Sequence, residues 1–204
     1  MTAVPDLTPS QDARVDIRDL RVSFVTDHGD VDAVNGVSLY LDPGEILAIV
    51  GESGSGKTVT ARTILGLLPE TATASGVVLV EGSNVVTMSQ AQLRGIRGKE
   101  AAMVFQEPSS ALNPVFPVWW QIGEGLRAHN PKLSKKELKA KAVEALRLVG
   151  IPEPEKRINR FPHEFSGGQK QRIIIAMALS MGAKIIVADE PTTALDVTVQ
   201  AEIL

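Results

Sequence analysis

Residues 51–58 read G-E-S-G-S-G-K-T, and this stretch constrains the fold more than any other part of the chain. It fits the phosphate-binding P-loop pattern, in which a glycine and four variable residues precede Gly-Lys-Ser/Thr. A continuous apolar run at residues 46–50 comes before the loop, and residues 57–68 carry apolar side chains at helical spacing after it. Because a strand, a glycine-rich loop and a helix follow in that order, the sequence predicts an α/β domain with a strand at 46–50 buried on both faces.

The loop residues predicted to bind a nucleotide are Gly51, Glu52, Ser53, Gly54, Ser55, Gly56, Lys57 and Thr58. Glycines let the backbone wrap around phosphates with several N–H groups pointing inward. We expect Lys57 to reach the terminal phosphates and the Thr58 hydroxyl to hold Mg²⁺. A glycine-rich turn with a chance lysine is the alternative, but every motif position and both flanks agree with a P-loop.

Asp189 and Glu190 follow a short apolar stretch, residues 185–188, that is typical of a strand. Ligands of parallel α/β sheets bind at the carboxyl ends of strands, so a metal-binding acid belongs at this position. We expect Asp189 to hold Mg²⁺ through water and Glu190 to be the catalytic residue that polarises the attacking water. Two acids at a solvated strand end are the alternative, which the P-loop on the same chain disfavours.

A second anion-seeking segment reads F-S-G-G-Q-K-Q-R at residues 165–172 and is followed by the apolar run I-I-I-A-M-A-L. The serine and glycines predict the cap and first turn of a helix, whose N–H groups and positive dipole end favour an anion. The alternative is a cap that only starts a buried helix. One chain therefore carries two candidate phosphate-binding helix starts.

The remaining pattern predicts an α/β core with an all-helical insertion. Apolar residues indicate β structure near residues 15–24, 37–41, 77–80 and 101–105. Between about 119 and 150 the pattern becomes helical, with a capping box at Ser134 and Glu137 and a glycine at the expected helix end, Gly150.

Composition narrows the class of protein. The formal net charge of −3 gives no support to nucleic-acid binding driven by overall charge, and the absence of cysteine excludes disulfides and thiolate metal sites. The first twelve residues are polar and carry prolines, so we expect a loose tail rather than a secretory signal. The most apolar window, near residues 173–188, is interrupted and too short to cross a bilayer. We therefore expect a soluble, cytoplasmic chain.

Taken in order, these motifs resemble the nucleotide-binding domain of an ABC transporter. The chain carries a P-loop, Gln106 after a strand, S-G-G-Q at 166–169, D-E at 189–190 and A-L-D at 194–196. Three longer stretches are similar to the ATPases of oligopeptide, dipeptide and nickel importers: Q-E-P-S-S-A-L-N-P from Gln106, P-H-E-F-S-G-G-Q from Pro162, and A-L-D-V-T-V-Q-A-E-I-L from Ala194. The resemblance covers nearly the whole chain beyond the first dozen residues.

The resemblance implies a P-loop NTPase core, with a mixed, mainly parallel sheet, an N-terminal antiparallel β subdomain and an inserted α-helical subdomain. It assigns residues 1–12 to a flexible tail and 13–204 to the ATP-binding domain. Within that domain we expect residues 13–106 and 182–204 to form the α/β core and about 107–181 to form the helical insertion.

The resemblance also explains why one chain carries two helix starts. Such domains dimerise head to tail and hold two ATP molecules, each between the P-loop of one domain and the S-G-G-Q stretch of the other. Ser166, Gly167, Gly168 and Gln169 are therefore expected to contact the nucleotide of the opposing subunit. Asp196 is expected to cross the dimer interface and couple the two sites.

Two further site residues follow from the resemblance. Gln106 resembles the glutamine that contacts the metal or the attacking water, which makes it a catalytic and metal-site candidate. An aromatic residue before the P-loop usually stacks on adenine, and Phe24 is the candidate, with ordinary strand core as the alternative.

The partners implied by the resemblance are a second ABC ATPase subunit, two transmembrane permease subunits and, indirectly, an extracytoplasmic substrate-binding protein, with no nucleic acid. The chain would then lie at the cytoplasmic face of the membrane, coupling ATP hydrolysis to uptake of a solute, most simply peptides. Trp119 or Trp120 could line the groove that receives a permease helix, and core packing of the helical lobe is the alternative.

The chain departs from the family pattern at its end. The family places another strand and then a histidine that contacts the γ-phosphate, and His28, His129 and His163 do not lie in that context. We expect this piece of 204 residues to bind ATP with Mg²⁺ and to hydrolyse it poorly.

Two other functions compete with import. A soluble ABC ATPase of DNA repair or translation is one; those with coiled coils insert hundreds of residues between the glutamine and S-G-G-Q, and here Gln106 and Ser166 are 60 positions apart. A P-loop kinase for a small molecule is the other, and it leaves the S-G-G-Q stretch unexplained.

Overall fold

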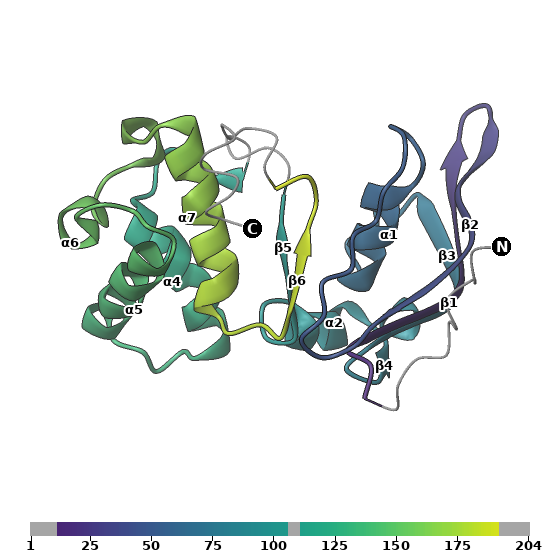
Figure 1. The fold of residues 1–204 in the computed structure, drawn as a ribbon, viewed down its shortest axis with the longest axis horizontal. Coiled ribbons are helices and arrows are strands. Elements are labelled where there is room, and N and C mark those ends of the chain that lie inside the picture. Colours follow the sequence, from purple (N-terminus) through teal and green to yellow (C-terminus); the bar gives the residue numbers. More distant parts are fainter. Residues whose placement is uncertain (1–11, 106–110, 192–204) are drawn as a thin grey trace, which may run out of the picture. The chain divides into compact units, whose positions relative to one another are not determined.

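The computed structural model describes residues 12–105 and 111–191 (Figure 1). The chain consists of two compact units, Met1–Ala101 and Ala102–Leu204. The first unit is built around an antiparallel sheet, and the second is mainly helical. Within the described ranges, no helix is both long enough and apolar enough to span a bilayer.

The sheet of the first unit has the order β2-β1-β3-β4. Strand β1 (Val15–Thr26) lies between β2 (Gly29–Leu41) and β3 (Ala72–Val80), and the short β4 (Ser83–Asn84) pairs with β3. Four apolar residues of β1 are buried, namely Val15, Ile17, Leu20 and Val22. The spacing changes after Ile17 because a bulge shifts the register there, which keeps Leu20 in the core. The predicted N-terminal antiparallel β region is confirmed.

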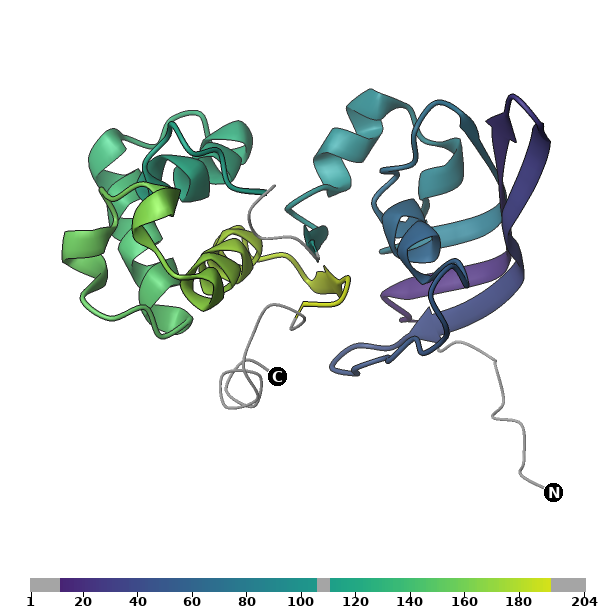
Figure 2. The same cartoon turned by 90° about the horizontal axis from the view of Figure 1, so that it is seen from above.

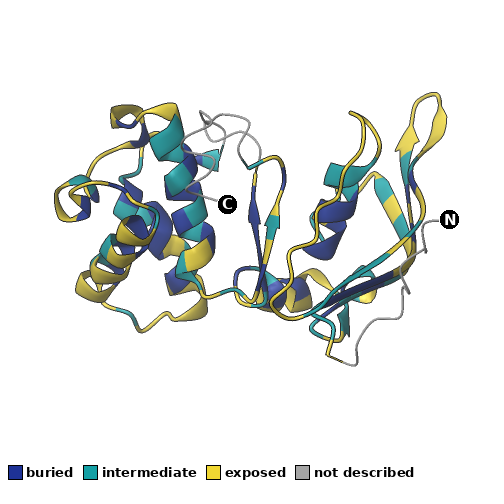
Figure 3. Cartoon of the chain, viewed as in Figure 1, coloured by how far each residue is buried: buried dark blue, intermediate teal, exposed yellow. Residues whose placement is uncertain are grey.

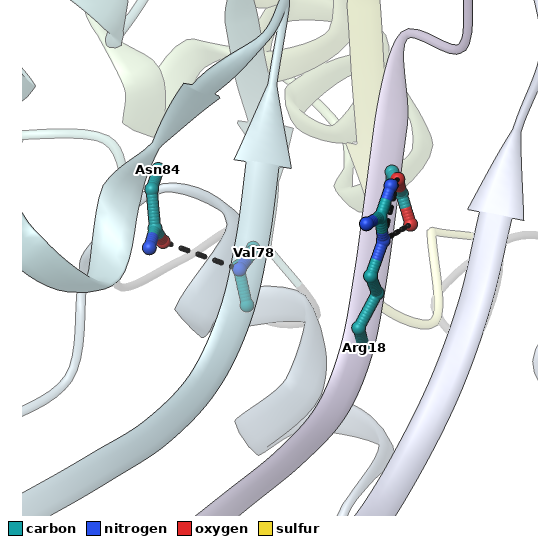
Figure 4. A network of polar contacts seen from close by, with 4 residues as sticks. Arg18, Val78 and Asn84 are labelled. Carbon is teal, nitrogen blue, oxygen red and sulfur yellow. Dashed lines mark hydrogen bonds and ion pairs between the residues drawn. The ribbon is translucent and has the colours of Figure 1, made fainter. Parts of the chain in front are cut away.

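Two polar contacts stabilise this sheet (Figure 4). Asp16 is buried, and the Nε of Arg18 donates to its Oδ1 and Oδ2 at 3.2 and 3.0 Å. The hydrogen bond to Asp16 and the charge of Asp16 raise the pKa of Arg18. Asn84 Oδ1 accepts from the backbone N–H groups of Val78 and Val86, at 3.2 and 3.3 Å, and so joins β3 to the 3₁₀ turn η1 (Val85–Thr87).

Helix α1 (Lys57–Ile64) packs against β1, β2 and β3, on one face of the sheet (Figure 2). The sequence predicted a helix to residue 68, but Gly66 adopts a left-handed conformation with φ 60° and ends it earlier. Arg97, at the end of α2 (Gln90–Ile96), donates from its guanidinium to the carbonyls of Leu65 and Gly66. Burial lowers the pKa of Arg97. The helix end therefore depends both on Gly66 and on Arg97, which lies 31 positions later in the chain.

The structure differs from the sequence-based prediction at residues 46–50. No strand is formed there, and Ile46, Leu47, Ile49 and Val50 are exposed (Figure 3). A strand requires hydrogen-bonded neighbours, and neither edge of the four-stranded sheet pairs with this run. The prediction of a strand buried on both faces therefore does not hold in this structure.

The second unit packs helices around a continuous apolar core. Strands β5 (Ala101–Val104) and β6 (Ile185–Ala188) form a two-stranded sheet and run in the same direction (Figure 1). Helices α4 (Val118–His129), α5 (Lys135–Leu148) and α7 (Gly167–Ser180) pack against one another, with α6 (Pro154–Arg157) and η2 (Pro162–Glu164) in the connections. Fully buried core residues include Val118, Ala142, Leu146, Ile173 and Ala176.

The predicted capping box at the start of α5 is present. The N–H and hydroxyl groups of Ser134 donate to Glu137 Oε2 at 2.8 and 2.6 Å, and Glu137 N–H donates back to Ser134 Oγ. The hydrogen bonds from Ser134 lower the pKa of Glu137. Gly150 follows the helix end with φ 68°, as predicted. The expected helical stretch consists of two helices, because residues 130–134 lie between α4 and α5.

The two units are divided after Ala101, so β6 groups with the helices. The sequence-based division placed residues 182–204 with residues 13–106 and assigned about 107–181 to an insertion. That division of the chain remains a prediction.

Candidate functional site

The glycine-rich loop has the backbone that a phosphate cradle requires. Gly54 and Gly56 have φ values of 82° and 87°, a region that residues with a Cβ rarely adopt. Gly56 is the N-cap of α1 and makes no side-chain cap bond, so the start of this helix presents backbone N–H groups. A Cβ on Gly56 would lie 2.4 Å from the carbonyl oxygen of Ala33, so this close approach needs glycine.

Lys57 closes the loop on itself. Its Nζ donates to the carbonyl oxygens of Gly51 and Glu52, both at 2.8 Å. Ser55 N–H donates to the Glu52 carbonyl at 3.2 Å, and a Cβ on Gly51 would lie 2.7 Å from Ser55 Oγ. Glycines with open backbone, a helix N-terminus and a lysine directed at the loop fit the phosphates of a nucleotide.

Two other predicted nucleotide residues lie in the first unit. Thr58 is half-buried in the first turn of α1, directly after Lys57. Phe24 is half-buried on β1, opposite Val31 of β2 and Ala72 of β3. Its ring is thus neither fully packed in the core nor fully exposed, and the structure leaves both of its predicted roles open.

The predicted helix start at Ser166 is present. Ser166 caps α7, its Oγ accepts from Gln169 N–H at 3.3 Å, and Ser166 N–H donates to Gln169 Oε1 at 3.2 Å. Ser166 and Gly167 are exposed, whereas Phe165 is buried and anchors the chain before the cap. A Cβ on Gly167 would meet no atom of the described residues within 4 Å, so packing within that part of the chain does not demand glycine there.

The acidic pair lies in the turn after β6. Asp189 is 9% exposed, and its N–H donates to the Val104 carbonyl of β5 at 3.0 Å. Glu190 is exposed and has φ 47°, an uncommon backbone conformation for a residue with a side chain. The two acids therefore differ in environment although they are neighbours.

Each unit carries an oxygen donor of the kind that Mg²⁺ prefers. The first unit offers the Thr58 hydroxyl and the second unit offers the Asp189 carboxylate, and both are hard ligands. Among residues 12–105 and 111–191, no three His, Cys, Asp or Glu side chains form a metal-binding cluster. Mg²⁺ characteristically uses one or two carboxylates together with substrate phosphates, so few protein ligands suffice.

Gln171 is a polar residue that the sequence reasoning did not single out. Its side chain is 1% exposed, and its Nε2 donates to the carbonyl oxygen of Pro191 at 2.7 Å. It lies within the polar run Q-K-Q-R at residues 169–172, so no local sequence signal distinguished it from its neighbours. It joins the helix that begins at Ser166 to the turn that carries Asp189 and Glu190.

An aromatic and cationic cluster lies on α4 and α5. Phe116 and Trp120 stack with ring centroids 4.1 Å apart, and Arg127 lies 5.7 Å from the Trp120 ring. Lys135 and Lys139 lie 5.4 and 5.1 Å from the Trp119 ring. Trp119 packs against the core of the second unit, which supports the core alternative for that residue.

The predicted site residues thus fall into groups. The first unit carries the loop 51–58 and Phe24, and the second carries Ser166–Gln169 and Asp189–Glu190, with Gln171 between the last two groups. Gln106 and Asp196 lie outside the described residues.

Residues 34–193 match the model of the ABC transporter family. The OppD oligopeptide transport ATP-binding protein of Bacillus subtilis is 53% identical over 192 residues, which cover 93% of this chain and 53% of that protein. The DppD dipeptide transport ATP-binding protein of the same organism is 50% identical over 92% of this chain and 56% of its own length. The OppD of Escherichia coli is 45% identical over 98% of this chain and 59% of its own. The chain spans little more than half the length of these relatives.

Solved structures agree in fold. The dimeric post-hydrolysis structure of the ATP-binding cassette MJ0796 with ADP and Pi has a TM-score of 0.82 at 28% identity, over 93% of this chain and 79% of that one. The cbiO1 protein of Clostridium perfringens, part of the transporter complex cbiONQ, has a TM-score of 0.74 at 29% identity, over 95% of this chain and 71% of that one.

Proposed function

The chain belongs to the ABC transporter family, with an ABC ATPase fold, and from this premise we propose that it is the ATP-binding and hydrolysing part of an importer subunit. The hydrolysis of ATP would be coupled to uptake of a solute, most simply a peptide. The observation that carries this proposal is the occurrence, on one chain, of two helix starts suited to phosphate: the loop closed by Lys57 and the cap at Ser166. The names of the OppD and DppD relatives support peptides as the cargo class.

The loop Gly51–Thr58 would hold the phosphates of ATP. Its backbone N–H groups and the α1 N-terminus supply donors, and Lys57 supplies the positive charge near the terminal phosphates. Phe24 is the proposed stacking partner of the adenine. Bound Mg²⁺ would neutralise charge on the phosphates, with Thr58, Asp189 and Gln106 as the residues proposed to hold it directly or through water.

The acids would act at different times. Asp189, buried and fixed by its bond to Val104, suits the constant task of holding a metal-bound water in place. Glu190, exposed beside it, suits the task of accepting a proton from the attacking water, with Gln106 helping to orient that water.

Two copies of the domain, or two related domains, would complete each other's sites. Ser166, Gly167, Gly168 and Gln169 are proposed to contact the nucleotide bound by the opposing subunit, and Asp196 to couple the two sites across the interface. The space around Gly167 supports this reading, since a Cβ there would meet none of the described residues within 4 Å. The relative MJ0796 was solved as a dimer with ADP and Pi.

The whole subunit would lie at the cytoplasmic face of the membrane and bind two permease subunits, with a substrate-binding protein acting on the far side. The surface formed by Trp120, Phe116 and Arg127 is the candidate contact with a permease helix, because it presents a stacked aromatic pair beside a cation.

The test is to produce the full-length subunit together with two polytopic membrane proteins that are its candidate permease subunits. We expect the three to co-purify, and we expect the complex in lipid to hydrolyse MgATP faster when a peptide-loaded binding protein is added. A subunit that binds MgATP but purifies without any membrane protein would overturn the importer function and leave the ATPase intact. A subunit that does not bind MgATP would overturn both.

A further inference from the structure

We propose that Gln171 is a positioning residue that holds the turn bearing Asp189 and Glu190 in register with the start of the S-G-G-Q helix. This inference rests on the proposed function. Under that function, the start of α7 serves the nucleotide of the opposing subunit, and the turn serves the nucleotide of its own. The side chain of Gln171 would make these two parts move as one body.

The geometry places Gln171 between the two parts. Helix α7 starts at the Ser166 cap, and Gln171 lies in its second turn. The N-terminus of α7 and the C-terminus of β6 lie at the same end of the second unit (Figure 1). The bond from Gln171 Nε2 to the Pro191 carbonyl, at 2.7 Å, therefore runs from the helix directly to the end of the acidic turn.

The turn is fixed on both sides of Glu190. Before it, Asp189 N–H donates to the Val104 carbonyl at 3.0 Å. After it, the Pro191 carbonyl accepts from Gln171. Glu190 lies between these anchors with φ 47°. A residue stays in such an unfavourable conformation only where its surroundings enforce it, so the two anchors account for the backbone of Glu190.

Stability alone does not explain a glutamine at this position. Gln171 is 1% exposed, and its Oε1 has no hydrogen-bond partner among the described residues. Burying an unpaired amide oxygen opposes folding, and an apolar side chain of the same length would avoid that cost. Neighbouring buried positions of α7 are apolar, among them Ile173 and Ile174. The bond to Pro191 is what glutamine supplies and methionine cannot.

Loss of this bond should affect catalysis more than binding. The loop 51–58 lies outside the turn and Asp189 keeps its separate bond to Val104, so affinity for MgATP should remain. The side chain of Glu190 would lose its fixed position, and a misplacement of about 1 Å at a reacting group can cost on the order of 100-fold in rate. We therefore expect kcat to fall by about tenfold or more, with KM for MgATP little changed.

The experiment uses the full-length subunit assembled with its membrane partners. Gln171→Met keeps the length of the side chain and removes the donor. We expect its melting temperature to stay within about 2 °C of wild type, because the unpaired oxygen is removed together with the bond. The matched control is Ile174→Val, which trims a buried side chain of the same helix without touching the bond; it should lower the melting temperature and keep kcat.

A second variant approaches the bond from the other side. Pro191→Gly keeps the carbonyl acceptor and leaves the helix unchanged, but it frees the backbone that carries this carbonyl, so it should weaken the bond and lower kcat by a similar factor. If both variants act through the same bond, the kcat of the double variant should be only slightly lower than the kcat of the worse single variant. Additive losses, a wild-type kcat for Gln171→Met, or loss of MgATP binding in that variant would each overturn the proposal. An inactive wild-type complex would instead count against the proposed function.

Discussion

The ammonium group of Lys57 lies 2.8 Å from the carbonyl oxygen of Gly51, so the last turn of the loop is joined to its first residue. A lysine ammonium has three N–H donors, and a second one is donated to Glu52. The third can be donated to a phosphate oxygen while the loop keeps its shape. We therefore expect Lys57 both to close the loop and to contact the nucleotide.

Replacing this lysine should abolish most of the affinity for nucleotide. In Lys57→Ala the charge opposite the β- and γ-phosphates is lost and the loop is no longer closed, so we expect the Kd for MgATP to rise by about 10- to 100-fold or more. A fluorescent ATP analogue measures this. Lys99→Ala, at an exposed lysine of the same unit, is the control and should bind normally. An unchanged Kd for Lys57→Ala would falsify the P-loop assignment.

Replacing different glycines of the loop with alanine should lower the free energy of unfolding by different amounts. Gly54→Ala meets no atom within 4 Å and suffers only from its φ of 82°, a penalty of about 1–2 kcal/mol in free energy of unfolding. Gly56→Ala adds an overlap with the Ala33 carbonyl at 2.4 Å, so it should be destabilised further. Gly82→Ala, with φ 75° and open space outside the loop, is the matched control. Chemical denaturation measures all three, and equal values for Gly54 and Gly56 would contradict the packing argument.

A bulky residue at the start of α7 should not change the folding or MgATP binding of the isolated subunit, but it should lower the ATPase activity of the assembled transporter. A Cβ at Gly167 would meet none of the described residues within 4 Å, so we expect Gly167→Leu to fold normally and the isolated subunit to bind MgATP normally. The assembled transporter should lose about tenfold or more of its ATPase activity, because the side chain would enter the space proposed for the opposing nucleotide. Gly95→Leu, at another unobstructed helical glycine, should not change the activity. A monomer that fails to bind ATP would refute the idea of two half-sites.

Substitution of the two acids should separate binding from turnover. In the assembled subunit, Glu190→Gln keeps the shape of the side chain and loses its basicity, so turnover should fall by about 10²–10⁴-fold while MgATP stays bound and the dimer stays closed. Asp189→Asn should instead weaken the Mg²⁺-dependent part of nucleotide binding. Size-exclusion chromatography of the ATP-loaded protein and a phosphate-release assay report the two effects. Near-normal turnover of Glu190→Gln would place the general base elsewhere.

Local sequence signals predicted helix starts and antiparallel strands well, because their causes lie within a few residues. The capping boxes of Ser134 with Glu137 and of Ser166 with Gln169 each consist of a serine and a polar residue three positions later, as does that of Ser89 with Gln92 at the start of α2. The alternation in β1 and β2 likewise reflects a sheet built from a hairpin.

Features that depend on distant parts of the chain were not predicted. The end of α1 depends on Gly66 and on Arg97, which no local pattern connects. The apolar run at 46–50 was interpreted as a strand, but hydrophobicity does not reveal whether a neighbouring strand is present to pair with it. The bond between Gln171 and Pro191 joins the first half of α7 to a turn 20 residues later, and only the folded chain brings them together.

The left-handed backbone at Glu190 bears on how a protein of this kind can be engineered. Glycine is the residue that this backbone conformation favours, so glycine is the substitution a screen for heat resistance would reward at this position. The same change removes the carboxylate. Selection for thermal stability alone would thus favour a stable variant that no longer hydrolyses ATP. Any library that covers this turn should therefore be screened for ATPase activity as well as for thermal stability.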